Sequence, residues 1–140
     1  MFVTAWMGVL DTVTGKVEFA NAGHNPPLVR HAGGGFEYLR SKPCFILAGM
    51  EGTKYKKYEL QLESGDEIFL YTDGVTEATD SENNLYGEER LLALLNSMGD
   101  LSGEEICRAV KADMDAFVGD APQFDDITML YLKYNGGDAK

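Results

Sequence analysis

The chain has 140 residues, which is enough for one domain with its own core and too few for two. Hydrophobic residues make up 44% of it and aromatic residues 11%, which excludes a disordered chain or a coiled coil, and no apolar run reaches the roughly 20 residues that span a bilayer. The net charge of −11, from 23 acidic and 12 basic residues, argues against binding to nucleic acid or to an anionic membrane.

The first part of the chain is predicted to form short strands. Residues 2–10 are apolar on both side-chain faces, which predicts a buried central strand, and residues 16–20 predict its hairpin partner. Residues 28–31 and 36–39 predict a second hairpin with short strands, at the edge of a sheet. Residues 41–54 show no period and contain glycine, proline and charge, so we expect a loop there.

The second part mixes strands with helices. Residues 55–62 alternate like a half-buried strand, and residues 68–71 are apolar on both faces, like a strand covered on both sides. Leucines at helical spacing predict a helix over 88–98, and a second helix starts at Ser102, where a serine followed by a glutamate three positions later forms a capping-box pattern. Residues 127–132, also apolar on both faces, predict a final strand.

These elements predict an α+β fold, mainly an antiparallel β-sandwich with flanking helices. Three of the strands need cover on both faces, yet two adjacent helices can cover only one face of one sheet. If two sheets pack face to face, the outer face of the other sheet has no shield in this chain. We therefore expect a piece of a larger domain that self-associates through this exposed face.

Two carboxylate motifs stand at the ends of buried strands and are candidates for holding a metal ion. Asp73-Gly74 follows the apolar strand directly; the alternative is that it is only a tight turn. Asp125 and Asp126 precede the last strand; the alternative is a solvated strand entry. Because adjacent strand residues point to opposite faces, one of this pair is expected to be a ligand and the other a support. An acidic domain that handles phosphate needs such a cation as a bridge.

His24 is a further candidate, because a histidine in an irregular loop of glycine, asparagine and two prolines can act as a ligand or a general acid. The alternative is that it fills or caps the turn. No serine or cysteine sits in a nucleophile elbow or beside a base, so covalent catalysis has no support.

Five short motifs follow one another from Phe2 to about Leu132: FVTA at 2–5, NAGHNPP at 21–27, LYTDGVTEA at 70–78, YGEERL at 86–91 and DDIT at 125–128. Their succession resembles the bacterial stage II sporulation protein E family, serine phosphatases of the metal-dependent type 2C class. The resemblance implies two central antiparallel sheets flanked by helices. It also implies an enzyme in which aspartates hold two Mn²⁺ or Mg²⁺ ions and a metal-bound water attacks phosphorus.

The resemblance also assigns roles to residues and partners. On matching positions Asp73 and Asp125 would be metal ligands, with Gly74 and Asp126 supporting them and His24 in a loop of the site. The implied substrate is a phosphorylated protein carrying phosphoserine or phosphothreonine, such as an anti-sigma factor antagonist, and a sensor domain would lie upstream. With only two cysteines and no secretory signal, the chain is expected to be cytoplasmic.

The chain departs from the family at one motif. The family also has an earlier strand that ends in an Asp-Gly or Asp-x-Ser-Gly-His-Gly motif, whose aspartate bridges both metals, and no aspartate here has that setting. We therefore expect residues 1–134 to be the C-terminal portion of a phosphatase catalytic domain and residues 135–140 a disordered tail. Alone, this portion would be inactive and bind Mn²⁺ or Mg²⁺ weakly or not at all. The alternative is a phosphatase-like module that only binds or regulates a partner.

Overall fold

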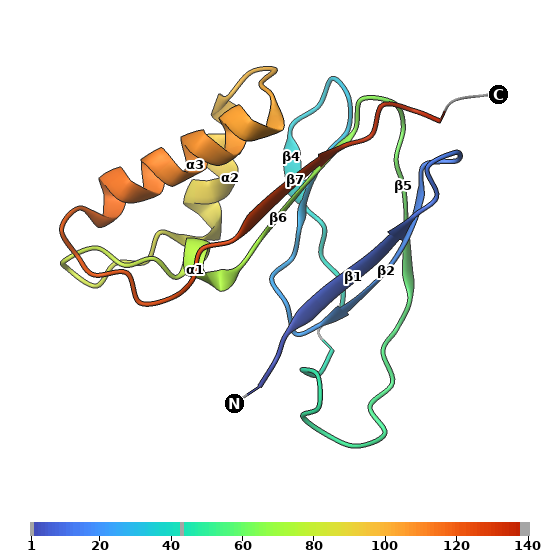
Figure 1. The fold of residues 1–140 in the computed structure, drawn as a ribbon, viewed down its shortest axis with the longest axis horizontal. Coiled ribbons are helices and arrows are strands. Elements are labelled where there is room, and N and C mark those ends of the chain that lie inside the picture. Colours follow the sequence, from blue (N-terminus) through green and yellow to red (C-terminus); the bar gives the residue numbers. More distant parts are fainter. Residues whose placement is uncertain (1, 43, 138–140) are drawn as a thin grey trace.

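The fold is a sandwich of two antiparallel sheets with helices on one side, as the sequence predicts (Figure 1). The computed structural model describes residues 2–42 and 44–137. One sheet has the strand order β1-β2-β5 and the other the order β4-β3-β6-β7. The strands are β1 (Ala5–Leu10), β2 (Lys16–Ala22), β3 (Leu28–Arg30), β4 (Phe36–Tyr38), β5 (Tyr58–Gln61), β6 (Glu67–Tyr71) and β7 (Met129–Lys133).

The three-stranded sheet buries one face because its strands alternate. Val17 and Phe19 on β2 point into the space between the sheets and are 3% and 4% exposed, whereas Lys16 and Glu18 point outward. The Phe19 ring stacks between Trp6 of β1 and Tyr58 of β5, with centroid distances of 5.4 and 5.5 Å. This aromatic row fixes the register of the sheet from its inner face.

Strand β6 lies inside the four-stranded sheet and is covered on both sides, as its apolar run predicts. Ile68 faces the core between the sheets, and Phe69 and Tyr71 face the helices. Its neighbours are β3 and β7, both antiparallel to it. The strand that ends at the candidate metal carboxylate is therefore paired along both edges and packed on both faces.

The helices cover only the four-stranded sheet (Figure 1). They are α1 (Asp73–Thr76), α2 (Gly87–Ser97) and α3 (Gly103–Val118), the last two close to the predicted ranges. The capping box at Ser102 is confirmed, with reciprocal bonds between Ser102 and Glu105. The buried apolar side chains of α2 and α3 form one core with β6: Leu91, Leu95, Ile106, Val110 and Met114. None of the described helices is both long enough and apolar enough to span a lipid bilayer.

Of the strand positions predicted for the first part of the chain, one is wrong and one is confirmed. Residues 2–10 were expected to form a central strand, but β1 is an edge strand that pairs only with β2 in its sheet, and Met7 and Val9 on it are 69% and 58% exposed. The hairpin expected at an edge is confirmed, because β4 is the edge strand of the four-stranded sheet and β3 lies between β4 and β6. The apolar composition of a strand indicates how much of its surface can be buried. It does not indicate which strands pair with it.

The final strand and the outer sheet face also need correction. Strand β7 was expected to be covered on both faces. It is instead an edge strand of the four-stranded sheet, at the edge opposite β4, and its Leu130 is 60% exposed. The outer face of the three-stranded sheet is mixed and not continuously apolar. The register puts Met7 and Val9 of β1 on the same face as Glu18. Strands β2 and β5 add Lys16 and Glu59, which form an ion pair of 3.0 Å. Within the described strands, the exposed large apolar side chains lie on the edge strands β1 and β7: Met7, Val9 and Leu130.

The edges of β1 and β7 flank an apolar groove of about 360 Å³, and we expect the chain to self-associate there. Met7→Lys should shift the association equilibrium toward monomer, because a lysine at an unpaired edge disfavours strand pairing. Sedimentation velocity over a concentration series measures this shift. Val13→Lys is the matched control, since Val13 is 70% exposed in the turn after β1, away from the groove. A wild-type chain that stays monomeric at high concentration would contradict this expectation.

Candidate metal centre

The carboxylate of Asp73 is placed by the junction between β6 and α1. Thr72 is in an extended conformation, with φ −94° and ψ 163°, and the four-residue helix α1 begins immediately after it, at Asp73. The sequence predicts a strand that stops at Asp73 but gives no sign of this short helix. Because α1 is helical, the residue four positions after Asp73 lies on the same face of the helical turn as Asp73.

Thr72 also joins α1 to the segment that carries Asp125. The Thr72 hydroxyl donates to the Asp126 carbonyl oxygen at 3.1 Å and accepts from the Thr128 N–H at 3.1 Å, and the Thr72 N–H donates to the Thr128 carbonyl oxygen at 3.0 Å. These bonds join two segments more than 50 positions apart in the chain. They bring Asp73 and Asp125 to the same end of the four-stranded sheet.

Gly74 allows this close approach. A Cβ atom on Gly74 would lie 2.1 Å from the Asp126 carbonyl oxygen, a contact that no side chain can make. Any larger residue would push the segment around Asp126 away from α1. The glycine of the Asp-Gly motif therefore has a packing role, which is distinct from the turn that this dipeptide also favours.

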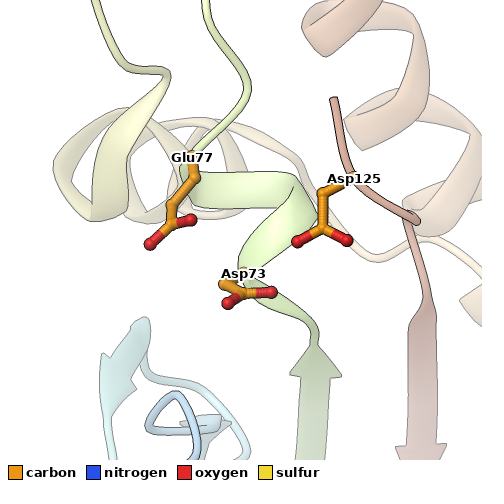
Figure 2. Close-up of side chains that lie close together, drawn as sticks. All are labelled: Asp73, Glu77 and Asp125. Carbon is orange, nitrogen blue, oxygen red and sulfur yellow. The ribbon is translucent and has the colours of Figure 1, made fainter. Parts of the chain in front are cut away.

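Three carboxylates meet at this junction: Asp73, Glu77 and Asp125 (Figure 2). Each offers one oxygen, these oxygens all lie within 4.8 Å of one another, and all three residues are exposed. Figure 2 shows the three side chains directed toward the same space beside α1, with Asp125 coming from the neighbouring segment. Oxygens that bind one Mn²⁺ or Mg²⁺ ion lie at most about 4 Å apart, so these exposed side chains need only small rotations to reach a shared hard divalent cation.

Glu77 is the member of the cluster that the sequence analysis does not identify. It directly follows α1, its N–H donates to the Asp73 carbonyl oxygen at 2.7 Å, and it stands four positions after Asp73. The i, i+4 spacing of the two acids is the signal that would have found it. That signal has meaning only once the helical turn between them is known.

Asp126 does not join the three converging carboxylates. Its backbone contacts both ligand segments: its carbonyl oxygen accepts a hydrogen bond from the Thr72 hydroxyl, and its N–H donates to the Asp125 carboxylate at 2.8 Å. The structure thus brings Asp73 and Asp125 together and uses Asp126 to orient the strand entry.

His24 is also outside the carboxylate cluster. Its backbone N–H donates to the Asn21 side-chain oxygen at 2.7 Å, its carbonyl oxygen accepts from the Asn21 amide at 2.9 Å, and its Nδ1 is 3.0 Å from the Thr4 hydroxyl oxygen. These bonds are those of a residue that caps an irregular turn. The loop still borders the site, because the Asn25 amide reaches the Thr76 hydroxyl of α1 at 3.5 Å.

Comparison with known proteins places this geometry in a family. The model of the stage II sporulation protein E (SpoIIE) family matches residues 1–135. Among curated proteins, the chain is 30% identical over 136 residues to protein IcfG of Synechocystis sp. and 27% identical over 141 residues to phosphoserine phosphatase RsbU of Bacillus subtilis. These matches cover 96% and 95% of this chain, but only 21% of IcfG and 39% of RsbU. The chain therefore spans well under half the length of either relative.

The fold is likewise similar to a solved phosphatase domain. The phosphatase domain of the cell fate determinant SpoIIE from Bacillus subtilis, in an Mn-presoaked form, superposes with a TM-score of 0.73 at 14% sequence identity. The superposition covers 98% of this chain and 59% of that one, and both sheets and the helices lie in the matched part. The family match over nearly the whole chain and the shared sandwich lead to one conclusion: this chain belongs to the stage II sporulation protein E family.

Proposed function

We propose that this chain is the metal-carboxylate portion of a protein serine/threonine phosphatase, which removes phosphate from phosphoserine or phosphothreonine in a partner protein. The observation that carries the proposal is the convergence of Asp73, Glu77 and Asp125 at the end of β6, in a chain of this family. The family match, the RsbU relative, whose name describes a phosphoserine phosphatase, and the Mn-presoaked SpoIIE structure support the reaction class and the choice of ion.

The residues of this chain would hold and orient the reacting groups. Asp73, Glu77 and Asp125 would bind Mn²⁺ or Mg²⁺, and the bonds from Thr72 to the segment around Asp126 would keep the two ligand segments in register. A bound divalent ion supplies an activated water and neutralises the charge of the phosphate. No serine or cysteine needs to act as a nucleophile in this scheme.

The substrate class follows from the same site. An open cluster of exposed carboxylates at a sheet end suits a phosphoryl group that is presented on the surface of another protein. We propose a phosphorylated partner protein such as an anti-sigma factor antagonist, in the cytoplasm, with activity controlled by a sensor domain elsewhere in the same protein. We also propose that the chain alone is a poor catalyst, because three exposed carboxylates hold an ion only loosely.

The test is phosphate release from a phosphoserine peptide, with Mn²⁺ or with EDTA, by this chain and by a longer version that includes any preceding coding sequence. We expect slow or undetectable release by the chain and Mn²⁺-dependent release by the longer version, lost in Asp125→Asn. Hydrolysis that persists in EDTA would overturn the metal mechanism. A longer version that binds the phosphopeptide without cleaving it would support the alternative, a non-catalytic binding or regulatory module.

A further inference from the structure

A groove of about 580 Å³ opens directly beside the carboxylate cluster and is not used by the proposed chemistry. It lies between the C-terminal end of α3, the segment that follows α1 and the segment that leads to β7. Glu77 and Asp125 line the groove and also belong to the cluster, so the two features are continuous. Anything bound at the carboxylates from a protein surface would have its flanking residues over this groove.

The groove is apolar inside and has exposed apolar side chains at its rim. Met114 of α3, 1% exposed, and Val118 form part of its wall. Leu85 and Phe124 also line it, and they are 60% and 80% exposed, Phe124 being the most exposed large hydrophobic residue in the described part of the chain. Large apolar side chains exposed around a concave surface mark a binding site more often than an ordinary surface.

The charge of the groove restricts its occupant. Glu77, Asp115 and Asp125 are among the residues that line it, and none of the lining residues in the described part of the chain is a lysine, arginine or histidine. Asp115 is paired with Lys111 one helical turn earlier, but both side chains are about half exposed, and such a pair contributes little. An apolar segment with a basic residue complements this surface, whereas an acidic one is repelled.

We propose that this groove docks the polypeptide around the phosphorylated residue of the substrate protein. A leucine-like side chain would lie between Leu85 and Phe124, and a basic residue would face Asp115. The proposal rests on the proposed phosphatase function, since that function brings a phosphorylated segment to the adjoining carboxylates. It makes the groove, and not the metal cluster, the part of this chain that selects among phosphorylated proteins.

The test uses the chain with Mn²⁺ and fluorescein-labelled phosphoserine peptides, with affinity measured by fluorescence anisotropy. One series moves a leucine through the positions around the phosphoserine beside a fixed lysine, and the parent peptide has serine at each of these positions. We expect one leucine position to increase affinity roughly tenfold over the parent, as burial of one apolar side chain provides. Replacing the lysine with glutamate should reduce the affinity of that peptide.

Leu85→Ser should remove most of the leucine preference. The matched control is Leu130→Ser on β7, which is equally exposed at 60% but lies outside the groove, and which should keep the preference. Phe124→Ser, in the segment that leads to β7, gives a second variant. A leucine series with no preferred position, or a preference lost equally in Leu130→Ser, would overturn the proposal.

Two further outcomes separate this proposal from the phosphatase function. Leucine-dependent binding by the chain, together with no phosphate release by the longer version, would support the groove and contradict the enzyme. Phosphate release by the longer version without any leucine preference would do the reverse. If Leu85→Ser increases the monomer fraction of the chain in sedimentation without peptide, the occupant is a second copy, and the substrate proposal is wrong.

Discussion

Asp73→Asn is expected to lower the affinity of the chain for Mn²⁺ by at least about tenfold, since changes even in residues that only support a metal ligand cost about 10–100-fold. The substitution preserves the shape of the side chain and removes one of three converging negative charges. For the wild-type chain we expect weak binding, with a dissociation constant on the order of 0.1–1 mM, the range of the weakest oxygen-ligand calcium sites, because few ligand charges and low rigidity weaken a site. Electron paramagnetic resonance of free Mn²⁺ during a titration measures both values.

Glu51→Gln is the control for this experiment. Glu51 is exposed in the loop between β4 and β5, so its replacement removes one negative charge without touching the cluster. Glu77→Gln should behave like Asp73→Asn if Glu77 is a ligand. Tight uptake of two ions by the wild-type chain, abolished by Asp73→Asn, would contradict our expectation of a weak site. Equal loss in Glu51→Gln would show that only the net charge attracts the ion.

Arg30→Ala is expected to destabilise the fold by about 3–5 kcal/mol, because it takes from a buried carboxylate the closer of its two cationic partners. Glu67 is 1% exposed at the start of β6, and the Arg30 guanidinium on β3 pairs with it across the sheet. The Tyr131 hydroxyl donates to the other Glu67 oxygen at 2.5 Å, and Lys133 is 3.8 Å away from that oxygen. The hydrogen bond to Glu67 raises the pKa of Arg30, and burial raises the pKa of Tyr131, so both remain protonated donors at neutral pH.

Urea denaturation of Arg30→Ala and of the double variant Arg30→Ala with Glu67→Gln separates two causes of this loss. Glutamine has no charge to leave uncompensated, so the double variant should recover part of the stability. Arg108→Ala is the control, since the Arg108–Glu104 pair on α3 is 77% and 71% exposed and should contribute less than about 1 kcal/mol. A loss in Arg30→Ala as small as the loss in Arg108→Ala would show that the buried pair is not needed.

The parts of the fold that the sequence predicts well are those with a long local period. The leucines of α2 and the apolar stripe of α3 recur at helical spacing, and Ser102 with Glu105 marks where α3 begins. The apolar run of β6 predicts a strand that is covered on both faces, as it is. In each case the residues that decide the structure are neighbours along the chain.

Strand position was harder to predict, because it depends on partners far away in the sequence. Residues 2–10 and 68–71 have the same apolar character, yet β6 lies inside a sheet and β1 at an edge. The hydrophobic pattern of a strand indicates which of its faces can be buried. An interior position and an edge position in a sheet both accept apolar residues on the inner face. The neighbours of a strand depend on its pairing with other strands, and the hydrophobic pattern of that strand alone does not contain this information.

The candidate metal centre likewise has features that the sequence predicts and features that depend on the tertiary structure. The sequence by itself determined that Asp73 ends a buried strand and that Asp125 precedes the last strand, because an abrupt change between apolar and acidic residues is local. Only the tertiary structure decided that Glu77 joins them, since the four-residue α1 is too short to show a helical period. It also decided that the two segments meet, because their contact depends on Thr72 reaching Asp126 past a glycine with no Cβ atom to keep them apart.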